Sequence, residues 1–497
     1  MPPGMPVNLL SISRFLTENR EAIFFSALFL SVLGGIFVAW SDVVKKIFVF
    51  GFIVSIVFPN QDIHFFVDVN FRGVASGRGL YFTLADLFLI SLALGILLAS
   101  GRRRPRLWFR GAGPYLAYIG LAAISLTSML SYAPVGFVNP AYAYGIFELA
   151  NIVKGFLVFW VMVNFIQSGR EIRMMLVAFM LIIVVETLAA LHQQYVLHSY
   201  HRTRGTVGHS NSLAMFLGML MPVILVLMLG QKRGGVLPWV LAALFIAGIT
   251  VMIKTVSRAG LISMAISCII AGAALVLSVR RLHAVRIAAL ILVMGAGGIF
   301  VAYKYWDRIM ARFTTHSKEA EASTASRIAL LKIGWEIAQK NLAIGNGINS
   351  FPIEIMLEDR YRHHRAEQHN LYLLTLCEVG ILGLLAFLAA IGRVFQMAWR
   401  LYRQNLSPPL KILSIGLACG MLHVCIESAF EFVFRAVFIS YMFWTFAGMI
   451  VACTYLLEAQ ARQLQRTRLA FARRMSGMRQ GAAARRPREV AAGGTGY

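Results

Sequence analysis

Apolar runs of about 20 residues recur along nearly the whole chain, and each is long enough to cross a hydrocarbon layer about 30 Å thick. Of the 497 residues, 58% are hydrophobic and only 14% are charged, which excludes an ordinary soluble enzyme. The apolar segments lie at 23–40, 46–58, 81–99, 114–130, 147–167, 173–191, 212–230, 236–254, 259–279, 285–303, 370–392, 410–427 and 434–457. The sequence therefore predicts an all-α polytopic membrane protein with 12 or 13 spans, and the course of the first 60 residues stays open.

Basic residues gather in alternate loops, which the positive-inside rule places in the cytoplasm. These loops are 102–106, 170–173, 232–233, 280–286 and 400–411. The tail 458–497 has 9 arginines against 2 glutamates and falls on the same side, with little regular structure expected from about Gly477. Topology explains much of the net charge of +25, so no nucleic-acid partner is expected. The loops 131–146, 192–211, 304–369 and 428–433 then lie on the outer side.

The cysteines and histidines do not form a metal-binding or disulfide pattern. All five cysteines lie in apolar runs without a CxxC pair, which indicates small packing residues. Four histidines surround the 192–211 loop without an HExxH pattern or a companion carboxylate, namely His192, His198, His201 and His209. We therefore expect neither a metal nor another cofactor.

The first candidate site is the Gly-containing loop 201–211, which leads directly into a predicted span. Ser210 or Asn211 is expected to cap that helix, and free N–H groups at a helix start form an anion site. Arg202 and Arg204 lie beside this helix start in the sequence. The loop is thus interpreted as a phosphate site, and the alternative is a turn whose arginines anchor to lipid headgroups.

A second pair of cations, Lys254 and Arg258, lies between two spans that leave almost no loop. On a continuous helix, residues four apart share one face. Cations on the side that the positive-inside rule disfavours indicate an anionic ligand. The alternative is that both side chains extend to lipid headgroups.

The long outer loop 304–369 contains an amphipathic pattern over 323–341, which predicts a helix resting on the membrane surface or on the bundle. Its apolar positions are Ile328, Leu331, Trp335 and Ala338, and Trp335 is interpreted as a packing residue. The helix is expected to stop at Gly345-Asn346-Gly347, where glycine allows positive φ. Arg327 is either a third anion contact or a solvated loop residue.

His369 stands at the mouth of the next span and is our candidate general base, since an imidazole titrates near neutral pH. Glu378, nine residues later, is expected to face another partner within the bundle. His423, Glu427, Glu431 and Arg435 are spaced by four and would form one polar ridge on a continuous helix. That ridge is interpreted as a buried ion-pair network, and the alternative is a site that binds a substrate hydroxyl or accepts a proton.

Taken together, these clusters resemble the O-antigen ligase and Wzy-type polymerase family of bacterial membrane glycosyltransferases. The matching residues, in order, are Arg204-Gly205-Thr206-Val207-Gly208-His209-Ser210-Asn211, Ser257-Arg258-Ala259-Gly260, Ser326-Arg327, Gly345-Asn346-Gly347, Phe351, His369-Asn370-Leu371-Tyr372, Glu378, Gly380 and Gly383. The resemblance covers about residues 200 to 390. One departure is Ser210, where many members have proline.

The resemblance implies a GT-C-like helical fold and a metal-independent transfer at the periplasmic face of the bacterial inner membrane. The donor would be an undecaprenyl-diphosphate-linked glycan, and the acceptor lipid A-core or a second lipid-linked glycan. Arg204 and Arg258 would hold the diphosphate, and His369 would deprotonate the acceptor. Further diphosphate contacts are expected of Arg202, Lys254 and Arg327, and supporting roles of His209, Asn211, Asn370, Glu427 and Glu431.

The expected organisation has four parts: N-terminal spans in 1–200, a catalytic core in 201–392, C-terminal spans in 393–457 and the basic cytoplasmic tail 458–497. The motifs do not separate a ligase from a polymerase, because both use the same kind of donor. A transporter or flippase of lipid-linked or anionic sugars also has many spans and intramembrane charge. It is the main alternative, although the charge in this sequence gathers at one interface rather than at the midplane.

Overall fold

The structure is a computed structural model of the chain, and it describes residues 19–58, 63–65, 80–99, 105–132, 140–198, 202–230, 235–278, 318–361 and 368–484. The helices are α2 (Arg20–Trp40), α3 (Asp42–Ser55), α4 (Leu84–Leu98), α5 (Ala112–Ser125), α6 (Ala141–Phe165), α7 (Gly169–Tyr195), α8 (Ser210–Gly230), α9 (Leu237–Thr255), α10 (Arg258–Ser278), α12 (Lys318–Lys340), α13 (Phe351–Leu357), α14 (Leu371–Arg403), α15 (Pro408–Glu427) and α16 (Val437–Ala484). Short 3-10 helices are η3 (Leu126–Ser131), η4 (Asp359–Tyr361) and η5 (Val433–Arg435). The strands β1 (Ile63–Phe65) and β2 (Leu80–Phe82) form one antiparallel pair that the sequence had not indicated.

Ten helices among the described residues are long and apolar enough to cross a membrane. Twelve of the thirteen predicted apolar segments coincide with helices, and the segment 285–303 lies outside the described residues. Within the first 60 residues, α2 has 21 residues and qualifies as a span, whereas α3 has only 14. The prediction of an all-α, multi-pass membrane protein is confirmed.

The spans pack closely where small residues face a neighbouring helix. Of the 18 consecutive residues that are most apolar in α8, 83% are buried, whereas the corresponding value in α9 is 28%. The helix α8 is therefore central in the bundle and α9 is peripheral. A methyl group added at Gly420 of α15 would lie 2.3 Å from the Met219 carbonyl oxygen of α8. Helix association in lipid relies on such close approaches, because lipid chains are as apolar as the side chains.

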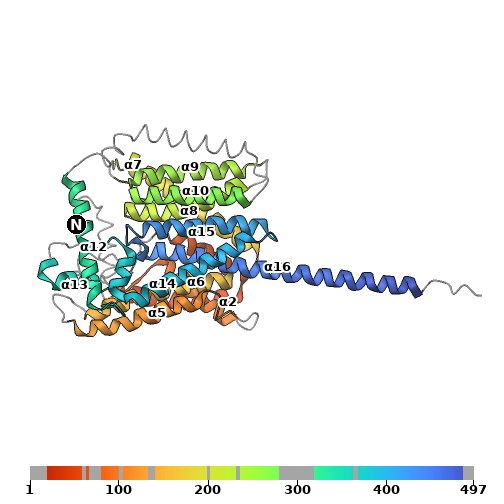
Figure 1. Cartoon of the computed structure of the whole chain (residues 1–497), viewed down its shortest axis with the longest axis horizontal. Helices are drawn as coiled ribbons and strands as arrows, with labels where there is room; N and C mark the ends of the chain where they lie inside the picture. The colour runs from red at the N-terminus through yellow and green to blue at the C-terminus, as the bar shows by residue number, and fades with distance from the viewer. Residues whose placement is uncertain are drawn as a thin grey trace, which may run out of the picture.

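The helix α12 does not run with the spans but lies across their ends (Figure 1). This end of the bundle is called the α12 face below. The predicted helix over 323–341 is thus confirmed, and it is followed by positive φ at Gly345 and Gly347 as expected. The long helix α16 projects from the opposite end of the bundle (Figure 1). It continues past Gly477 to Ala484, so the expected end of regular structure near Gly477 was wrong, and the alanine-rich sequence explains why.

The helix α14 is broken at Gly380, which has φ 72° and ψ −177°. The break frees backbone groups that the segment after α12 then pairs. The Ile381 amide donates to the Leu342 carbonyl oxygen at 2.8 Å, and the Asn346 amide donates to the Cys377 carbonyl oxygen at 2.9 Å. From Ile381 to Arg403 the helix is still about 34 Å long, enough to span a bilayer. The break therefore joins a membrane span to the elements of the α12 face.

We predict that Gly380→Ala destabilises the protein by about 2 kcal/mol or more, because a side chain strains this backbone conformation. Its Cβ would also lie 2.3 Å from the Ala343 carbonyl oxygen. Thermal unfolding in one detergent measures the effect. The matched control is Gly392→Ala in the same helix, where a Cβ meets no atom within 4 Å and alanine favours the helix. Equal melting temperatures for the two variants would contradict the assigned role of the break.

Candidate functional site

The Glu431 carboxylate lies at the centre of a polar cluster on the α12 face. It pairs with the Arg327 Nη2 at 2.8 Å and with the His369 Nδ1 at 3.2 Å, and it accepts a hydrogen bond from the Asn211 Nδ2 at 2.7 Å. These residues form the Glu431 cluster. They come from four separate segments: the start of α8, helix α12, the residue two before α14, and the loop after α15. Three of the predicted site residues therefore meet at a fourth.

Glu431 is held as a buried anion. Its side chain is 3% exposed, and burial acts to raise the pKa of its carboxyl. The hydrogen bond and charge of His369, together with the Arg327 guanidinium, act more strongly, so the pKa lies below its ordinary value. Because an ionised carboxylate only accepts hydrogen bonds, His369 must present a protonated Nδ1 to it.

His369 is fixed in position by its neighbours and remains 29% exposed. The following residue, Asn370, caps α14 by accepting from the Leu373 amide at 2.9 Å and donates to the Ala429 carbonyl oxygen at 3.1 Å. The ring of Phe432 meets the imidazole edge to face at 5.8 Å. With Nδ1 directed at Glu431, the Nε2 of His369 is the nitrogen available to accept a proton.

Arg202 connects the loop before α8 to the end of α9. Its Nε donates to the Thr255 carbonyl oxygen at 2.8 Å, and its Nη2 donates to the Asn211 side chain. The Thr203 amide also donates to the Lys254 carbonyl oxygen at 3.1 Å. Asn211 thus bridges Arg202 and Glu431 instead of capping α8. The expected side-chain cap by Ser210 or Asn211 was wrong for Asn211, because its amide is used between segments; Ser210 is itself the first residue of α8.

Two residues of α7 that sequence reasoning missed shape the loop around Arg204. The Gln193 side chain accepts from the amides of Arg204 and Gly205 at 3.1 and 3.2 Å. The Glu186 carboxylate binds the Thr206 amide and hydroxyl. At Gly205 φ is +59°, and a Cβ would lie 2.1 Å from Glu186, so glycine is required. An acid inside an apolar run was the available signal for Glu186.

The Arg204 side chain is exposed and has no hydrogen-bond or ion-pair partner among the described residues. His209 lies near it at the surface. Partial burial lowers the pKa of His209, and the charges of Arg202 and Arg204 lower it further, while Glu431 acts in the opposite direction. Neutral imidazole is therefore favoured at His209, and the positive charge of this loop is carried by its two guanidinium groups.

Lys254 and Arg258 do not share a helix face, contrary to the expectation. The helix α9 ends at Thr255, Val256 has φ +53°, and α10 begins at Arg258, so a tight turn separates the two cations. Lys254 binds the Gln194 side chain and lies 5.5 Å from the Tyr195 ring centre. Arg258 is exposed in the first turn of α10. Both lie close to the loop 202–209 before α8, called the Arg202 loop below. The Thr255 and Lys254 carbonyl oxygens accept hydrogen bonds from Arg202 and Thr203 of this loop.

The expected polar ridge on one continuous helix was also wrong, because α15 ends at Glu427. His423 and Glu427 form their own pair at 3.1 Å, with both side chains fully buried. A methyl group at Gly218 of α8 would lie 2.2 Å from the His423 Nε2, and one at Gly260 of α10 would lie 3.1 Å from the Glu427 Oε1. The pair is therefore enclosed by α8, α10 and α15 rather than placed in the Glu431 cluster.

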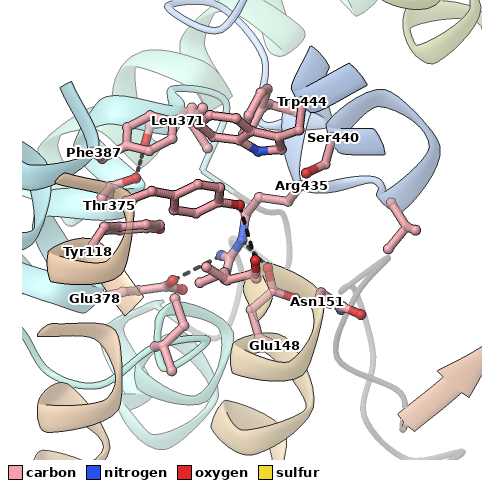
Figure 2. A pocket seen from close by; sticks show the side chains of 15 residues that line it. Tyr118, Glu148, Asn151, Leu371, Thr375, Glu378, Phe387, Arg435, Ser440 and Trp444 are labelled. Carbon is pink, nitrogen blue, oxygen red and sulfur yellow. Dashed lines mark hydrogen bonds and ion pairs between the residues drawn. The ribbon is translucent and has the colours of Figure 1, made fainter. Parts of the chain in front are cut away.

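Arg435, in η5 four residues after Glu431, is the centre of a second buried ion-pair group. Its Nε lies 2.9 Å from Glu148 and its Nη1 lies 2.9 Å from Glu378. Figure 2 shows the Arg435 side chain between these two carboxylates. Glu378 thus faces a partner within the bundle, as expected. Aromatic side chains line the adjoining cavity, which has about 40 Å³ open to water-sized molecules, room for about three waters. Arg435 is therefore a buried cation held between two carboxylates.

In the described residues there is no group of three or more His, Cys, Asp or Glu side chains that could hold a metal ion.

The site residues predicted from the sequence lie in three places. The Glu431 cluster contains Asn211, Arg327 and His369. The adjacent loop before α8 contains Arg202, Arg204 and His209, with Lys254 and Arg258 at the neighbouring α9–α10 turn, and Glu427 lies inside the bundle.

Comparison with known families supports the resemblance over part of the chain. Residues 242–388 match the family model described as O-Antigen ligase. This segment includes Arg258, Arg327 and His369, whereas the Arg202 loop and Glu431 lie outside it. No curated protein matches the chain.

The lowered pKa of Glu431 predicts a pH-dependent contribution to stability. That contribution is present above the ordinary carboxyl pKa of 4.5 and is lost as the pH falls through the lower folded-state value. We expect Glu431→Gln to reduce the melting temperature most near pH 7, and the difference from wild type to shrink below about pH 4.5. Glu21→Gln on the exposed first turn of α2 is the control. A deficit of constant size from pH 7 to pH 3.5 would contradict an ionised Glu431.

Proposed function

We propose that this protein is a membrane glycosyltransferase that moves a glycan from an undecaprenyl-diphosphate carrier to an acceptor sugar hydroxyl. In this proposal the α12 face is the periplasmic face of a bacterial inner membrane. The match to the O-antigen ligase family supports the class of reaction. The single observation that carries the proposal is the contact of the His369 Nδ1 with Glu431 at 3.2 Å, beside a loop of cations.

The proposed general base is the Nε2 of His369. Glu431 fixes the tautomer and the ring orientation, and its negative charge stabilises the imidazolium that forms during proton transfer. Arg327 binds the same carboxylate, so Glu431 contacts both the imidazole and a guanidinium group. The Arg327 side chain is 39% exposed, so the guanidinium can meet both Glu431 and a bound anion.

The cations next to this base are proposed to stabilise the leaving group. Departure of a diphosphate requires stabilisation of developing negative charge, which guanidinium groups supply through charge-assisted hydrogen bonds. Arg204 and Arg258 are exposed on the α12 face and are the proposed principal contacts, with Arg202, Lys254 and Arg327 near them. In this proposal the arginines take the place of a metal ion.

The proposed step conserves atoms and charge. The acceptor hydroxyl gives its proton to the His369 Nε2, and its oxygen forms a bond with the anomeric carbon of the donor. The bond between that carbon and the phosphate oxygen breaks, and the electron pair leaves with undecaprenyl diphosphate. The imidazolium then releases its proton to water at the membrane surface, which regenerates the base.

The proposal is tested by incubating purified protein with an undecaprenyl-diphosphate oligosaccharide, with and without lipid A-core, in the presence of a chelator. Mass spectrometry identifies the products. Glycosylated lipid A-core identifies a ligase, and a ladder of lengthened lipid-linked glycans without it identifies a polymerase. Absence of both products with authentic substrate overturns the proposal and favours transport of lipid-linked sugars.

We predict that His369→Ala lowers the transfer rate by at least about a hundredfold, the usual contribution of a general base. Glu431→Gln should lower it less and should shift the pH–rate profile, because the amide no longer stabilises the imidazolium. Rates are measured with the mass-spectrometric assay after thermal unfolding has verified that each variant folds. A His369→Ala variant with the wild-type rate would remove His369 from the chemistry.

We further predict that Arg258→Lys and Arg204→Lys each reduce transfer about tenfold or more, although the charge is kept. Lysine lacks the planar fork that binds phosphate oxygens in pairs. Arg400→Lys, in the last turn of α14 at the opposite end of the bundle, is the matched control and should retain the wild-type rate. Full activity in both test variants would instead support simple anchoring of these arginines to lipid headgroups.

A further inference from the structure

The helix α12 presents three different faces, and two of them are already occupied by the protein. One face is buried against α13 and α14 and contains Leu330, Ile333, Ile337 and Ala338. The Gly334 carbonyl oxygen also accepts from the Cys377 thiol at 2.9 Å. This face attaches α12 firmly to the part of α14 that precedes the Gly380 break.

The second face is polar and is covered by the outer segment that contains α13 and η4. Lys340 pairs with Glu354 at 2.7 Å, and Glu336 pairs with Arg360 at 3.5 Å and accepts from the Tyr361 hydroxyl. These contacts place the aqueous side of α12 toward α13 and η4. The remaining face of α12 therefore points away from α13 and η4.

The third face is an exposed apolar stripe, defined by Ile328, Leu331 and Trp335 at helical spacing on α12 and by Leu342 in the turn that follows the helix. Their exposed fractions are 52%, 41%, 50% and 46%. Trp335 was interpreted as a packing residue, and it does not pack inside the protein, where Leu330, Ile333 and Ile337 are buried instead. An apolar stripe of this kind on an outer helix requires a partner of its own.

The stripe is continuous with the lipid-facing surface of α14. Leu342, at its end, receives the Ile381 amide hydrogen bond at 2.8 Å, so the stripe meets α14 where the membrane span resumes after Gly380. The residues that follow on α14 are also exposed and apolar, with Leu382 at 48% and Leu385 at 56%. A surface that faces lipid along the span thus turns at Leu342 and continues along α12.

We infer that α12 is an interfacial helix whose stripe enters the boundary between headgroups and hydrocarbon of the adjacent leaflet. The occupant is the bilayer itself, because the stripe joins the lipid-facing surface and lies opposite the polar face. The crosswise position of α12 at the ends of the spans (Figure 1) suits a helix lying in the membrane plane. Tryptophan with aliphatic neighbours is typical of this depth.

This placement has a consequence for the Glu431 cluster. Arg327 directly precedes Ile328, the first residue of the stripe, and its guanidinium lies 2.8 Å from Glu431. Docking of α12 on lipid therefore holds Arg327 at the edge between the bilayer and the cluster. A lipid-linked anion that diffuses in the leaflet would meet this guanidinium as it leaves the lipid. The docking itself does not depend on the proposed reaction.

The inference is tested by labelling Leu331→Cys with an environment-sensitive fluorophore and placing the protein in phospholipid nanodiscs without substrate. The matched variant is Glu336→Cys, on the polar face of the same helix. Of the native cysteines, Cys425 is partly exposed and the other four are buried, so wild-type protein treated with the same reagent gives the background. Lipids that carry a nitroxide quencher high on the acyl chain report contact with the bilayer.

We expect the label at residue 331 to be quenched at least about threefold more than the label at residue 336, and its emission to shift to the blue. Equal quenching at both positions overturns the inference. An unquenched but blue-shifted label at residue 331 also overturns it, because another part of the protein or a protein partner would then cover the stripe. Ile328→Cys, one turn earlier in the stripe, should reproduce the Leu331 result.

Discussion

The buried negative charge of Glu431 is the interaction on which the rest of the site depends. A carboxylate that is 3% exposed is costly unless charged and hydrogen-bonding partners surround it. Glu431 obtains these partners from Asn211, Arg327 and His369, which belong to three other segments of the chain. Removing the charge therefore affects the start of α8, the position of α12 and the orientation of the imidazole together. The Glu431 side chain therefore links the positions of these segments to the orientation of the His369 ring.

The loop between α15 and α16, which contains Glu431, is held in place by further buried polar contacts. Arg435, four residues after Glu431, is bound by Glu148 and Glu378, so the loop between α15 and α16 is fixed at two points. Asn370 binds the same loop at Ala429, directly beside His369. A loop held in this way can present Glu431 at a constant distance from the imidazole. The Arg204 side chain, in contrast, is exposed on the surface of the Arg202 loop.

The sequence predicted the spans and identified the polar residues that meet at Glu431, because hydropathy and polar residues at span ends are local signals. Arg327, His369 and Asn211 were all identified as candidates, and they meet. The errors arose where a helix was assumed to continue: α9 turns at Val256 and α15 ends at Glu427, so residues four apart lost their common face. Long-range partners such as Glu186 and Gln193 could not be assigned, because their roles depend on which helix lies beside the loop.

The most direct test of the central claim is the protonation pattern of the His369 ring, measured by nitrogen-15 solid-state NMR of the protein in bilayers. Subtraction of the His369→Gln spectrum isolates its signals from those of the other histidines. If Glu431 accepts from Nδ1, the neutral ring carries its proton on Nδ1 and leaves Nε2 unprotonated, and Glu431→Gln changes this pattern. A neutral ring protonated on Nε2, unaffected by that substitution, would contradict the assignment of Nε2 as the base.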